Sequence, residues 1–562
     1  MRHATQIPAV LGASIRKSRV CVSTSSSTPA TAKEEKQQPV SSGDAVPTDA
    51  LIIGGGPAGL AAAMMLAKRG WNVTVAERHA QVSYADPDRS YVYAIDGRGR
   101  VFTDAYGLTP KLAEAGVDTK AVEVNRVFPN GKVVNARQVI KDEARIVYWL
   151  PRMKFVRLLE YRVKEQDMAP YITLLTNTEA SDIERLPTNS SSSSAAQQVQ
   201  VTLRNTVTGN TQRFVPKLLL GCDGMNSLVR QSMQHWAADD SSSSSRFSIA
   251  EYPSLSTDLR FKVLQLPPNP AMKDGTVLRN PSFCLLAGQK SKSIGGPPLR
   301  LGLLPIKDES VGRTANLITL PDHPVWGVSD AATLYKVFEE AFPQADWRAL
   351  VPEPVMAKFA ASQGGQFPAP QHSRGMALLV SPESPPGPAA AAAAPDAAAV
   401  KGTGVLLLGD AAHCFPPDLG QGVNSALEDV CVLQRELDAA GDDLAQALPA
   451  FEQQRQPDSE ALAKLVQTGY PLQYNQYPLL RAVWSARFIA HMLVHKLLPF
   501  AISPPLFLMI QDPSRRYSSV LAATEHSKKV LAGLAVLLVG AAAVLLQQLL
   551  PKLLKLFATG SA

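Results

Sequence analysis

Residues 49–77 read DALIIGGGPAGLAAAMMLAKRGWNVTVAE and decide the fold of the chain around them. The apolar run Ala50–Ile53 predicts a buried parallel strand, which the following glycines end in a tight turn. Leu60–Arg69 is rich in Ala, Leu and Met and predicts a helix, and Trp71–Ala76 predicts the next strand. Strand, glycine turn, helix and strand in this order are typical of a dinucleotide-binding unit.

The glycine turn has the spacing G-x-G-x-x-G. Gly54 permits the bend, Gly56 lets the backbone approach a pyrophosphate, and Gly59 lets the helix pack close to the strand. The helix N-terminus directs N–H groups and the positive end of its dipole at the same place. Glu77 ends the second strand, where a carboxylate accepts ribose hydroxyls and disfavours a 2′-phosphate, so FAD or NAD is expected. The predicted cofactor-binding residues of this unit are Gly54, Gly56, Ala58, Gly59, Glu77 and Arg78.

Composition narrows the class of protein. The 562 residues carry a formal charge of +7, but residues 1–33 contain five basic and no acidic residues. The rest of the chain is nearly neutral and lacks the strongly basic charge that is typical of nucleic-acid-binding proteins. The five cysteines are scattered without a C-x-x-C pair, so neither a disulfide framework nor a metal site is predicted.

The first 47 residues are rich in Ser, Thr, Arg and Lys, with a sparse apolar pattern and no continuous apolar run. This composition is typical of an organellar transit peptide, with a disordered tail as the alternative. Plastid and mitochondrion both stay open, and the Ser and Thr content leans towards the plastid.

A second strand-and-turn motif follows at residues 214–230. The apolar strand Phe214–Leu220 runs into GCDGMNSLVR, which places a carboxylate at the carboxyl end of a parallel sheet. Ligands of such sheets bind at this edge. The candidate ligand-binding residues here are Asp223, Gly224 and Arg230.

The third motif is GDAAHCFPPDLGQGVN, residues 409–424, after the apolar run Val405–Leu408. Its glycine loop starts the predicted helix Ser425–Leu437, whose N-terminus suits negative charge on the flavin N1–C2 carbonyl region. Asp410 is placed to bond a ribityl hydroxyl. The predicted cofactor-binding residues are Gly409, Asp410, Gly420, Gln421, Gly422, Val423 and Asn424.

The fold class expected is α/β, with a Rossmann-like FAD-binding domain interleaved with a smaller β-rich substrate domain, a C-terminal helical region and a transmembrane helix. Residues 89–108 predict a strand, a Gly/Arg turn and an amphipathic helix, and β-rich segments fill 252–320. The expected divisions are 1–47 (transit peptide), 48–250 (FAD-binding domain, with substrate-domain segments at about 90–150), 251–380 (substrate domain), 381–400 (Pro/Ala linker), 401–440 (FAD-binding domain), 441–528 (helical, near the membrane) and 530–550 (transmembrane).

The membrane prediction depends on two apolar stretches. Val530–Leu550 is 21 uncharged residues long, which at about 1.5 Å each gives about 31 Å, close to a bilayer core. A buried core helix is the alternative. Upstream, Phe488–Ile510 is apolar but broken by Lys496 and three prolines, so an interfacial or re-entrant helix pair is expected there.

Together, GGGPAG, GCDGMNSLVR and GDAAHCFPPDLGQGVN resemble the fingerprint of single-component FAD aromatic monooxygenases of the para-hydroxybenzoate hydroxylase type. The resemblance covers residues 48–440. It implies a held FAD, a visiting NAD(P)H without its own Rossmann unit, and O2-dependent hydroxylation through a C4a-hydroperoxyflavin. It also implies that Arg152 contacts FAD, that Asp223 and Arg230 serve FAD and the nicotinamide nucleotide, and that the Pro417 carbonyl helps orient a substrate hydroxyl.

Within that family the sequence most resembles the kynurenine 3-monooxygenases, through Arg89-Ser90 before GRGR and the C-terminal extension. One departure concerns the substrate carboxylate, which an Arg and a Tyr bind in those enzymes. The corresponding places in this sequence hold Val122 and the run near Arg137-Gln138. Lys120, Arg126 or Arg137 would substitute if the register differs by a few residues. We therefore expect a partly apolar aromatic or terpenoid substrate that arrives from the membrane, with kynurenine as the alternative.

Other interpretations stay open. The same FAD frame serves isoprenoid-lipid epoxidases and reductases, and a membrane-tethered flavoprotein sensor would hold FAD without turnover. His413 is expected to bond within its turn in preference to acting as a general base, and Cys414 to be a small buried residue. The pair His491 and His495 suits a metal less well than a membrane-facing helix. Core packing is the default for Tyr470, Tyr474 and Tyr477.

Overall fold

The computed structural model describes residues 45–84, 91–120, 123–137, 146–186, 198–238, 245–380, 402–469, 472–474 and 477–559. The predicted transit peptide, the Ser/Ala insertion at 190–196 and the Pro/Ala linker lie outside these residues. Arg89, Ser90, Val122, Gln138 and Tyr470 lie outside them too.

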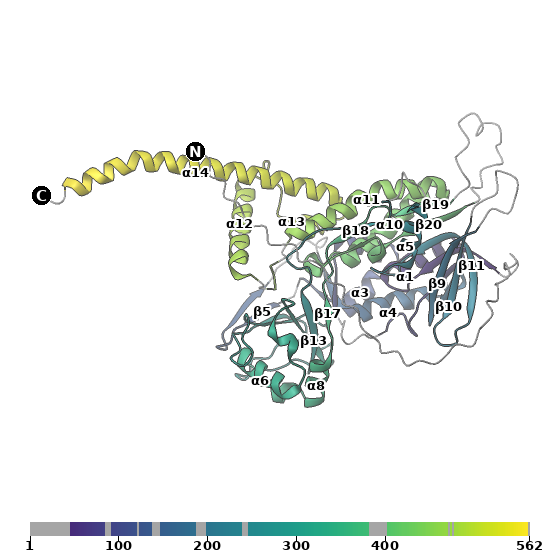
Figure 1. Ribbon diagram of the computed structural model, residues 1–562, viewed down its shortest axis with the longest axis horizontal. Helices are drawn as coiled ribbons and strands as arrows, with labels where there is room; N and C mark the ends of the chain where they lie inside the picture. The colour runs from purple at the N-terminus through teal and green to yellow at the C-terminus, as the bar shows by residue number, and fades with distance from the viewer. Residues whose placement is uncertain are drawn as a thin grey trace, which may run out of the picture. The chain divides into compact units, whose positions relative to one another are not determined.

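The first sheet has eight strands and holds the dinucleotide-binding unit (Figure 1). Its main path runs β19-β20-β11-β1-β2-β8, with all neighbours parallel except β19 and β20, and β10 and β9 extend from β11. The strands are β1 (Ala45–Ile53), β2 (Val73–Ala76), β8 (Ile172–Leu175), β9 (Thr178–Arg185), β10 (Val199–Asn205), β11 (Thr211–Gly221), β19 (Ala377–Val380) and β20 (Thr403–Leu407).

The strand ends of this sheet are in register. Ile53 pairs with Gly221, and Gly221 pairs with Leu407, so the three glycine motifs leave the sheet along one edge. The strands are apolar on both faces because helices cover both, and the residues at 50–52, 218–220 and 405–407 are fully buried. The helices packed with this core are α1 (Pro57–Lys68), α4 (Arg152–Val163), α5 (Leu228–Ala238), α10 (Gly422–Ala440) and α11 (Leu444–Thr468).

A second sheet of seven strands has its own hydrophobic core. Its order is β17-β13-β16-β15-β14-β5-β6, antiparallel except between β14 and β5. The strands are β5 (Glu123–Val127), β6 (Val133–Arg137), β13 (Arg260–Leu266), β14 (Phe283–Ala287), β15 (Arg300–Leu303), β16 (Arg313–Thr319) and β17 (Gly365–Gln366), packed with α6 (Ala331–Ala341), α7 (Trp347–Leu350) and α8 (Glu353–Ala361). Two strands come from 123–137, within the early segment assigned to the substrate domain, while the domain boundaries stay predictions.

Two small sheets connect these parts. One joins β3 (Val92–Ile95), β7 (Tyr148–Pro151) and β4 (Val117–Asp118), and α3 (Thr109–Ala115) lies beside it. The other joins β12 (Ile249–Glu251), β18 (Gln371–Ser373) and β21 (His413–Cys414).

The prediction of a Gly/Arg turn at 97–100 is wrong, because these residues form the first turn of α2 (Gly97–Ala105). Asp96 caps this helix by accepting a hydrogen bond of 2.9 Å from the Arg98 N–H. A Cβ at Gly99 would lie 2.4 Å from the Asn424 side-chain oxygen, so glycine serves a close approach between helices here.

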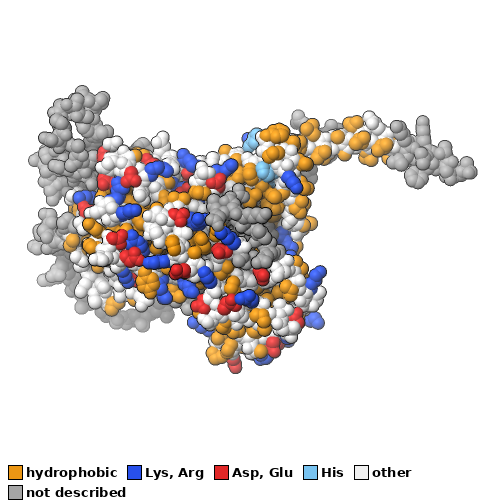
Figure 2. All heavy atoms as spheres, turned by 180° about the vertical axis from the view of Figure 1, so that it is seen from behind, with side chains coloured by type: hydrophobic (Ala, Val, Ile, Leu, Met, Phe, Trp, Pro, Cys, Tyr) orange, Lys and Arg blue, Asp and Glu red, His pale blue; other side chains and the backbone are white. Residues whose placement is uncertain are grey.

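The C-terminal region contains α12 (Pro478–Leu497), α13 (Leu506–Met509) and α14 (Tyr517–Thr559). By length and composition, Tyr517–Pro551 within α14 is a candidate membrane span, and none of its most apolar window is buried. Figure 2 shows hydrophobic side chains along the exposed part of this helix. The stretch Val530–Leu550 is therefore not the alternative buried core helix, and the span itself is considered below as a proposal.

Candidate flavin site

The three glycine motifs meet at the carboxyl edge of the first sheet. A Cβ at Gly54, whose φ is +105°, would lie 2.3 Å from the carbonyl oxygen of Cys222. A Cβ at Gly409 would lie 3.1 Å from Cβ of Ala58 and 3.3 Å from Cβ of Ala426. The first motif thus touches the second at the strand ends, and the third lies between the N-terminal turns of α1 and α10.

The turn around Gly56 has the space that a pyrophosphate requires. No atom lies within 4 Å of the place where a Cβ of Gly56 would stand, whereas a Cβ of Gly59 would lie 1.9 Å from the Gly54 oxygen. Gly56 is the N-cap of α1, and no side chain caps this helix. Open space before an uncapped helix N-terminus fits a diphosphate group.

Glu77 stands at the end of β2, where the sequence placed it. Its carboxylate is buried and accepts hydrogen bonds of 2.9 Å from the N–H groups of Gly55 and His79. It therefore ties the glycine turn to the second strand, and each oxygen keeps a further lone pair for a ribose hydroxyl. The neighbouring Arg78 is exposed, and its Nε lies 3.3 Å from Nε2 of His79.

Asp410 lies at the Gly409 turn among other titratable side chains. It is exposed, and burial among neighbouring groups raises the pKa of its carboxyl, with His413 and Arg152 opposing that rise. Tyr91 is 43% exposed, and burial likewise raises the pKa of its phenol. Tyr93 and Arg152 belong to this group, since their charges act on the same pKa values. The bond from Asp410 to a ribityl hydroxyl stays a prediction.

Asp223 and Arg230 make structural contacts in the second motif. One oxygen of Asp223 accepts hydrogen bonds from the N–H groups of Leu228 (2.6 Å) and Val229 (3.3 Å), so it caps α5. The other oxygen, Oδ1, is buried without a partner among the described residues. The Arg230 guanidinium donates to the carbonyls of Met225 (2.9 Å) and Ala411 (3.1 Å). Their service to FAD and the nicotinamide nucleotide stays a prediction, to which Asp223 Oδ1 offers a free acceptor.

The loop Gly420–Asn424 presents main chain to the site, because its side chains are engaged elsewhere. Gly420 has φ +63°, a conformation that glycine adopts without strain. Gln421 Nε2 donates to Asp96 Oδ2 at 2.7 Å, and Asn424 bonds the Asp96 N–H and the Ala94 carbonyl. No side chain caps α10. The N–H groups of Gly422 and Val423 thus begin a helix whose positive end is available to an anionic ring edge.

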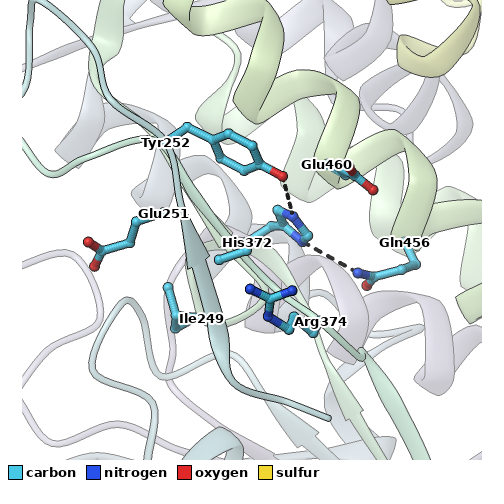
Figure 3. A pocket seen from close by; sticks show the side chains of 8 residues that line it. Ile249, Glu251, Tyr252, His372, Arg374, Gln456 and Glu460 are labelled. Carbon is cyan, nitrogen blue, oxygen red and sulfur yellow. Dashed lines mark hydrogen bonds between the residues drawn. The ribbon is translucent and has the colours of Figure 1, made fainter. Parts of the chain in front are cut away.

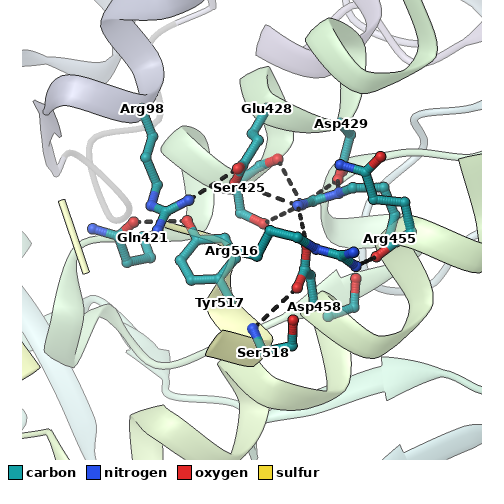
Figure 4. A network of polar contacts seen from close by, with 12 residues as sticks. Arg98, Gln421, Ser425, Glu428, Asp429, Arg455, Asp458, Arg516, Tyr517 and Ser518 are labelled. Atoms are coloured by element: carbon teal, nitrogen blue, oxygen red, sulfur yellow. Dashed lines mark hydrogen bonds and ion pairs between the residues drawn. The ribbon is translucent and has the colours of Figure 1, made fainter. Parts of the chain in front are cut away.

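His413 lies in a buried ionic network with Asp429 and Arg455, and Figure 4 shows the last two of these residues. Its Nε2 is 2.8 Å from Asp429 Oδ2, which also accepts from the Gly409 N–H at 2.9 Å. Arg455, fully buried, donates to Asp429 Oδ1 through Nε at 2.8 Å and Nη2 at 2.6 Å. Although burial opposes it, His413 and Arg455 lower the pKa of Asp429. His413 thus bonds structurally, as expected, but the expectation that it bonds within its own turn is wrong, because its partner is Asp429 on α10.

Pro417 and Cys414 show no catalytic geometry of their own. Pro417 is exposed, and its carbonyl accepts a hydrogen bond of 3.1 Å from the Gly420 N–H. The Cys414 thiol is buried, and burial raises its pKa well above the ordinary value, as expected for a small buried residue. The role of the Pro417 carbonyl towards a substrate stays a prediction.

The C-terminal segment contributes support that sequence reasoning missed (Figure 4). Arg98 is buried, pairs with Glu428 at 2.9 Å and lies 3.9 Å above the Tyr517 ring. It also donates to the carbonyls of Ile510 and Arg515. A signal was present, because a buried arginine on an otherwise apolar helix face needs acceptors. The partners lie more than 300 residues away, beyond the reach of local patterns.

The sequence offered three cations for binding a substrate carboxylate, and the contacts of one of them, Arg126, can be described. Arg126 on β5 lies 4.8 Å above the Phe128 ring, and its Nε is buried without a hydrogen-bond partner among the described residues. Lys120 follows β4, and Arg137 ends β6. Tyr474 packs against Phe367, with the ring centroids 5.5 Å apart.

A pocket of about 380 Å³ lies between β12, β18 and α11 (Figure 3). His372 stands in it between Tyr252 and Gln456, with its Nε2 3.2 Å from the Tyr252 hydroxyl. Arg374 and Glu460 also line it. This polar lining of mixed charge does not match the mostly apolar pocket that an aromatic ring requires.

Comparison with known proteins supports an FAD-binding monooxygenase. The sequence profile of the FAD binding domain family matches residues 47–259 and 391–465, more than half of the chain. The kynurenine 3-monooxygenase of Salinispora tropica is 27% identical over 507 residues, covering 88% of this chain and 96% of that protein. That of Xanthomonas euvesicatoria is 34% identical over 138 residues, 22% of this chain and 27% of that protein. The structure of aklavinone-11 hydroxylase with FAD and aklavinone has a TM-score of 0.51 at 18% identity, over 78% of this chain and 70% of that one, and supports the fold alone.

A parallel sheet whose glycine turns converge on two uncapped helix N-termini defines an FAD-binding oxidoreductase. The chain belongs to the FAD binding domain family and is an FAD-dependent aromatic monooxygenase. NAD(P)H as reductant is typical of this family.

Proposed function

We propose that this monooxygenase hydroxylates a partly apolar aromatic substrate, such as an aromatic head on a lipid tail or a terpenoid, that reaches the site from a membrane. The reaction consumes O2 and NAD(P)H and yields the hydroxylated product, NAD(P)⁺ and water. The observation that carries this proposal is the exposed apolar helix α14, whose first turn bonds the flavin loop through Tyr517 and Gln421. A site attached so directly to a membrane anchor favours substrates concentrated in that membrane.

The chain's own residues bind and orient the cofactor in this proposal. The N–H groups at the start of α1 hold the pyrophosphate above Gly56, Glu77 accepts the adenosine ribose, and Asp410 accepts a ribityl hydroxyl. Tyr91 and Arg152 exclude water beside Asp410, and the N-terminus of α10 stabilises negative charge on the ring. When bound, FAD supplies the redox chemistry that places one atom of O2 on the substrate.

Few of the candidate cations are suited to bind the polar end of the substrate. Arg126 stacks on Phe128, which leaves its guanidinium oriented by an aromatic face and less free to clamp a carboxylate. Because the sequence predicts no Arg/Tyr pair for a carboxylate, we expect burial of apolar surface to supply most of the binding free energy. This reasoning favours a lipophilic substrate over a small, soluble amino acid.

L-Kynurenine is the second candidate substrate. The observation that favours it is the similarity to the kynurenine 3-monooxygenase of Salinispora tropica across 88% of this chain. In that case Lys120, Arg126 or Arg137 provides the carboxylate contact.

Location in an organelle membrane, plastid or mitochondrial, completes the proposal, with Val530–Leu550 as the anchor and residues 1–47 as the transit peptide. Lys528 and Lys529 precede the anchor and suit the headgroup region. Extraction with alkaline carbonate tests the anchor, because an integral protein stays with the membrane. The full chain should resist extraction and a chain ending at Lys529 should be released; identical behaviour of the two would contradict the anchor.

A substrate comparison tests the activity. Purified full-length protein is supplied with NADPH, O2 and either L-kynurenine at sub-millimolar concentration or lipophilic phenols in mixed micelles, and products are identified by mass spectrometry. We expect lipophilic phenols to stimulate NADPH oxidation and gain one oxygen atom. Stoichiometric 3-hydroxykynurenine, with no turnover of phenols, would replace the apolar substrate by kynurenine. An epoxide or a reduced double bond would instead assign the protein to isoprenoid lipid chemistry.

A further inference from the structure

Helix α12 exposes its large apolar side chains instead of burying them. The large apolar side chains along one side of α12 are exposed, and so is Phe500 just after the helix. They recur at helical spacing, and their exposed fractions are Leu479 77%, Val483 52%, Ile489 58%, Leu493 57%, Leu497 76% and Phe500 86%. No residue of α12 is buried. In water such a stripe faces a core, so this helix shows the opposite arrangement to a soluble one.

Three polar side chains of α12 hydrogen-bond main-chain carbonyls, while Arg487 and Lys496 are exposed. His491 donates from Nε2 to the Ser503 carbonyl at 2.9 Å, and His495 donates from Nδ1 to the Ile502 carbonyl at 2.8 Å. The hydroxyl of Ser485 bonds the Arg481 carbonyl at 2.9 Å. The two histidines satisfy carbonyls of the loop after α12, whereas Ser485 bonds within the helix. The two histidines therefore fasten α12 to its own loop, with apolar residues left outside.

The sequence around α12 carries only positive charge, and Glu525 of α14 is the acid that acts on the neighbouring Lys528. Residues 461–511 contain no Asp or Glu, while Arg481, Arg487 and Lys496 lie on α12 itself. A basic segment with an exposed apolar stripe is the pattern of a helix that lies in the interface of a membrane with anionic lipids.

The position of α12 is fixed where α14 leaves the protein. The Ser503 N–H donates to the Ser527 hydroxyl at 3.1 Å, and Arg487 lies close enough to Lys528 to lower the pKa of that lysine together with burial, which is the larger cause. Ser527 and Lys528 directly precede the apolar stretch 530–550. In Figure 1, α12 runs crosswise to α14 at this place. A helix that crosses a spanning helix where it enters the bilayer lies along the membrane surface.

We propose that the stripe Leu479–Phe500 is a second membrane contact, seated at the boundary of headgroups and acyl chains of anionic lipids while α14 spans the bilayer. This inference rests on the anchoring proposed above and deepens it. Two contacts, one across the bilayer and one along it, fix the orientation of the flavin domain, which a single spanning helix leaves free to rotate about its axis.

The test uses the full chain reconstituted in nanodiscs that contain anionic lipid. Nitroxide labels are placed singly through Leu493→Cys and Phe500→Cys on the stripe, Val536→Cys on α14, and Val207→Cys, 75% exposed on the turn after β10. The unsubstituted chain, treated identically, gives the background from its own cysteines. Accessibility to O2 and to a water-soluble nickel chelate reports the depth of each label.

We expect the labels at 493 and 500 to be shielded from nickel at shallow depth, the label at 536 to be deep, and the label at 207 to be aqueous. Nickel access at 493 and 500 equal to that at 207, with 536 still deep, would overturn the surface contact and leave the anchor intact. Aqueous behaviour at 536 would refute the anchor itself. Spin–spin broadening at 493 that persists without lipid would assign the stripe to a second copy of the chain.

A charge substitution gives an independent readout. Leu493→Asp with Leu497→Asp should lower the initial partition of the full chain into anionic vesicles by about tenfold, because burial of two leucines is lost and two charges oppose the surface. Val207→Asp is the matched control and should change nothing. Melting temperature reports whether each variant is folded, and equal partition of the folded double variant and the wild type would contradict the proposal.

Discussion

The hydroxyl of Tyr517 donates a hydrogen bond of 2.8 Å to Oε1 of Gln421. The first residue of the C-terminal helix α14 is thereby joined to the residue that precedes α10 in the flavin loop. Gln421 passes the contact on to Asp96 through its own amide. The start of the C-terminal helix α14 is thus part of the framework that holds the loop in place.

Tyr517→Phe removes this contact and keeps the ring. We expect the dissociation constant of FAD to rise about fivefold, the equivalent of about 1 kcal/mol for one buried hydrogen bond. Fluorescence titration of the apoprotein with FAD measures it. Tyr161→Phe is the control, because that ring is 58% exposed. An unchanged FAD affinity in a stably folded Tyr517→Phe protein would separate the α14 contact from the flavin loop.

Gly56→Val tests the pyrophosphate position without a clash in the apoprotein. Gly56 has φ −73°, which any residue adopts, and its Cβ position has no neighbour within 4 Å. We expect an unchanged melting temperature of the apoprotein and a protein purified without yellow colour, because the side chain occupies the place of the diphosphate. Gly327→Val, which has similar space in the other part of the fold, should keep its FAD. Full flavin occupancy in Gly56→Val would show that the diphosphate lies elsewhere.

Asp410→Ala removes the carboxylate at the Gly409 turn that the sequence predicts to bond a ribityl hydroxyl. A lost hydrogen bond to a charged group is worth about 1.5–3 kcal/mol, so we expect FAD affinity to fall about tenfold or more and coupled turnover with it. The absorbance spectrum of bound flavin and the ratio of hydrogen peroxide to product report its seating. Asp438→Ala, whose side chain is 57% exposed, serves as the comparison. Wild-type affinity and coupling in Asp410→Ala would remove this residue from the site.

Asp96 predicts a pH dependence of stability. Burial raises the pKa of this carboxyl from 3.8 to about 7, with Gln421 and the Arg98 N–H opposing the rise. Because the folded state holds the proton more tightly than the unfolded state, this contribution to stability is complete below about pH 4 and is lost as pH rises to 7. Asp96→Asn keeps the shape and does not titrate. The fall in melting temperature between pH 5 and 7.5 should be smaller in this variant, and identical slopes would contradict the assignment.

Much of the site could be predicted because it depends on local patterns. The three glycine turns, the strands before them and Glu77 at the end of β2 occupy the places that spacing indicated. Even Arg152, placed by resemblance alone, begins α4 beside the Tyr91 carbonyl, which accepts its N–H at 3.0 Å. Short-range sequence signals determine such features because backbone conformation and burial act within a few residues of one another.

The rest depends on contacts between distant segments. The start of α2 was missed because the cap Asp96 competes with a glycine-rich run that reads as a turn. Neither Arg455 with Asp429 nor Arg98 with Tyr517 leaves a local pattern, since each partner only shows the composition of its own helix. The polar face of α12 likewise could not be predicted from its own sequence, because hydrogen bonds to the loop after the helix define it.

Chain order in the first sheet determines when the residues of the flavin site are all present. β20, at residues 403–407, pairs with β11 inside the sheet, yet the whole run of strands β13 to β17 of the other core precedes it in the chain. During synthesis the edge of β11 stays unpaired until β20 emerges, and unpaired edges invite wrong partners. The Gly409 turn and α10 follow only then, so the flavin site is complete only after the β-rich part has been synthesised.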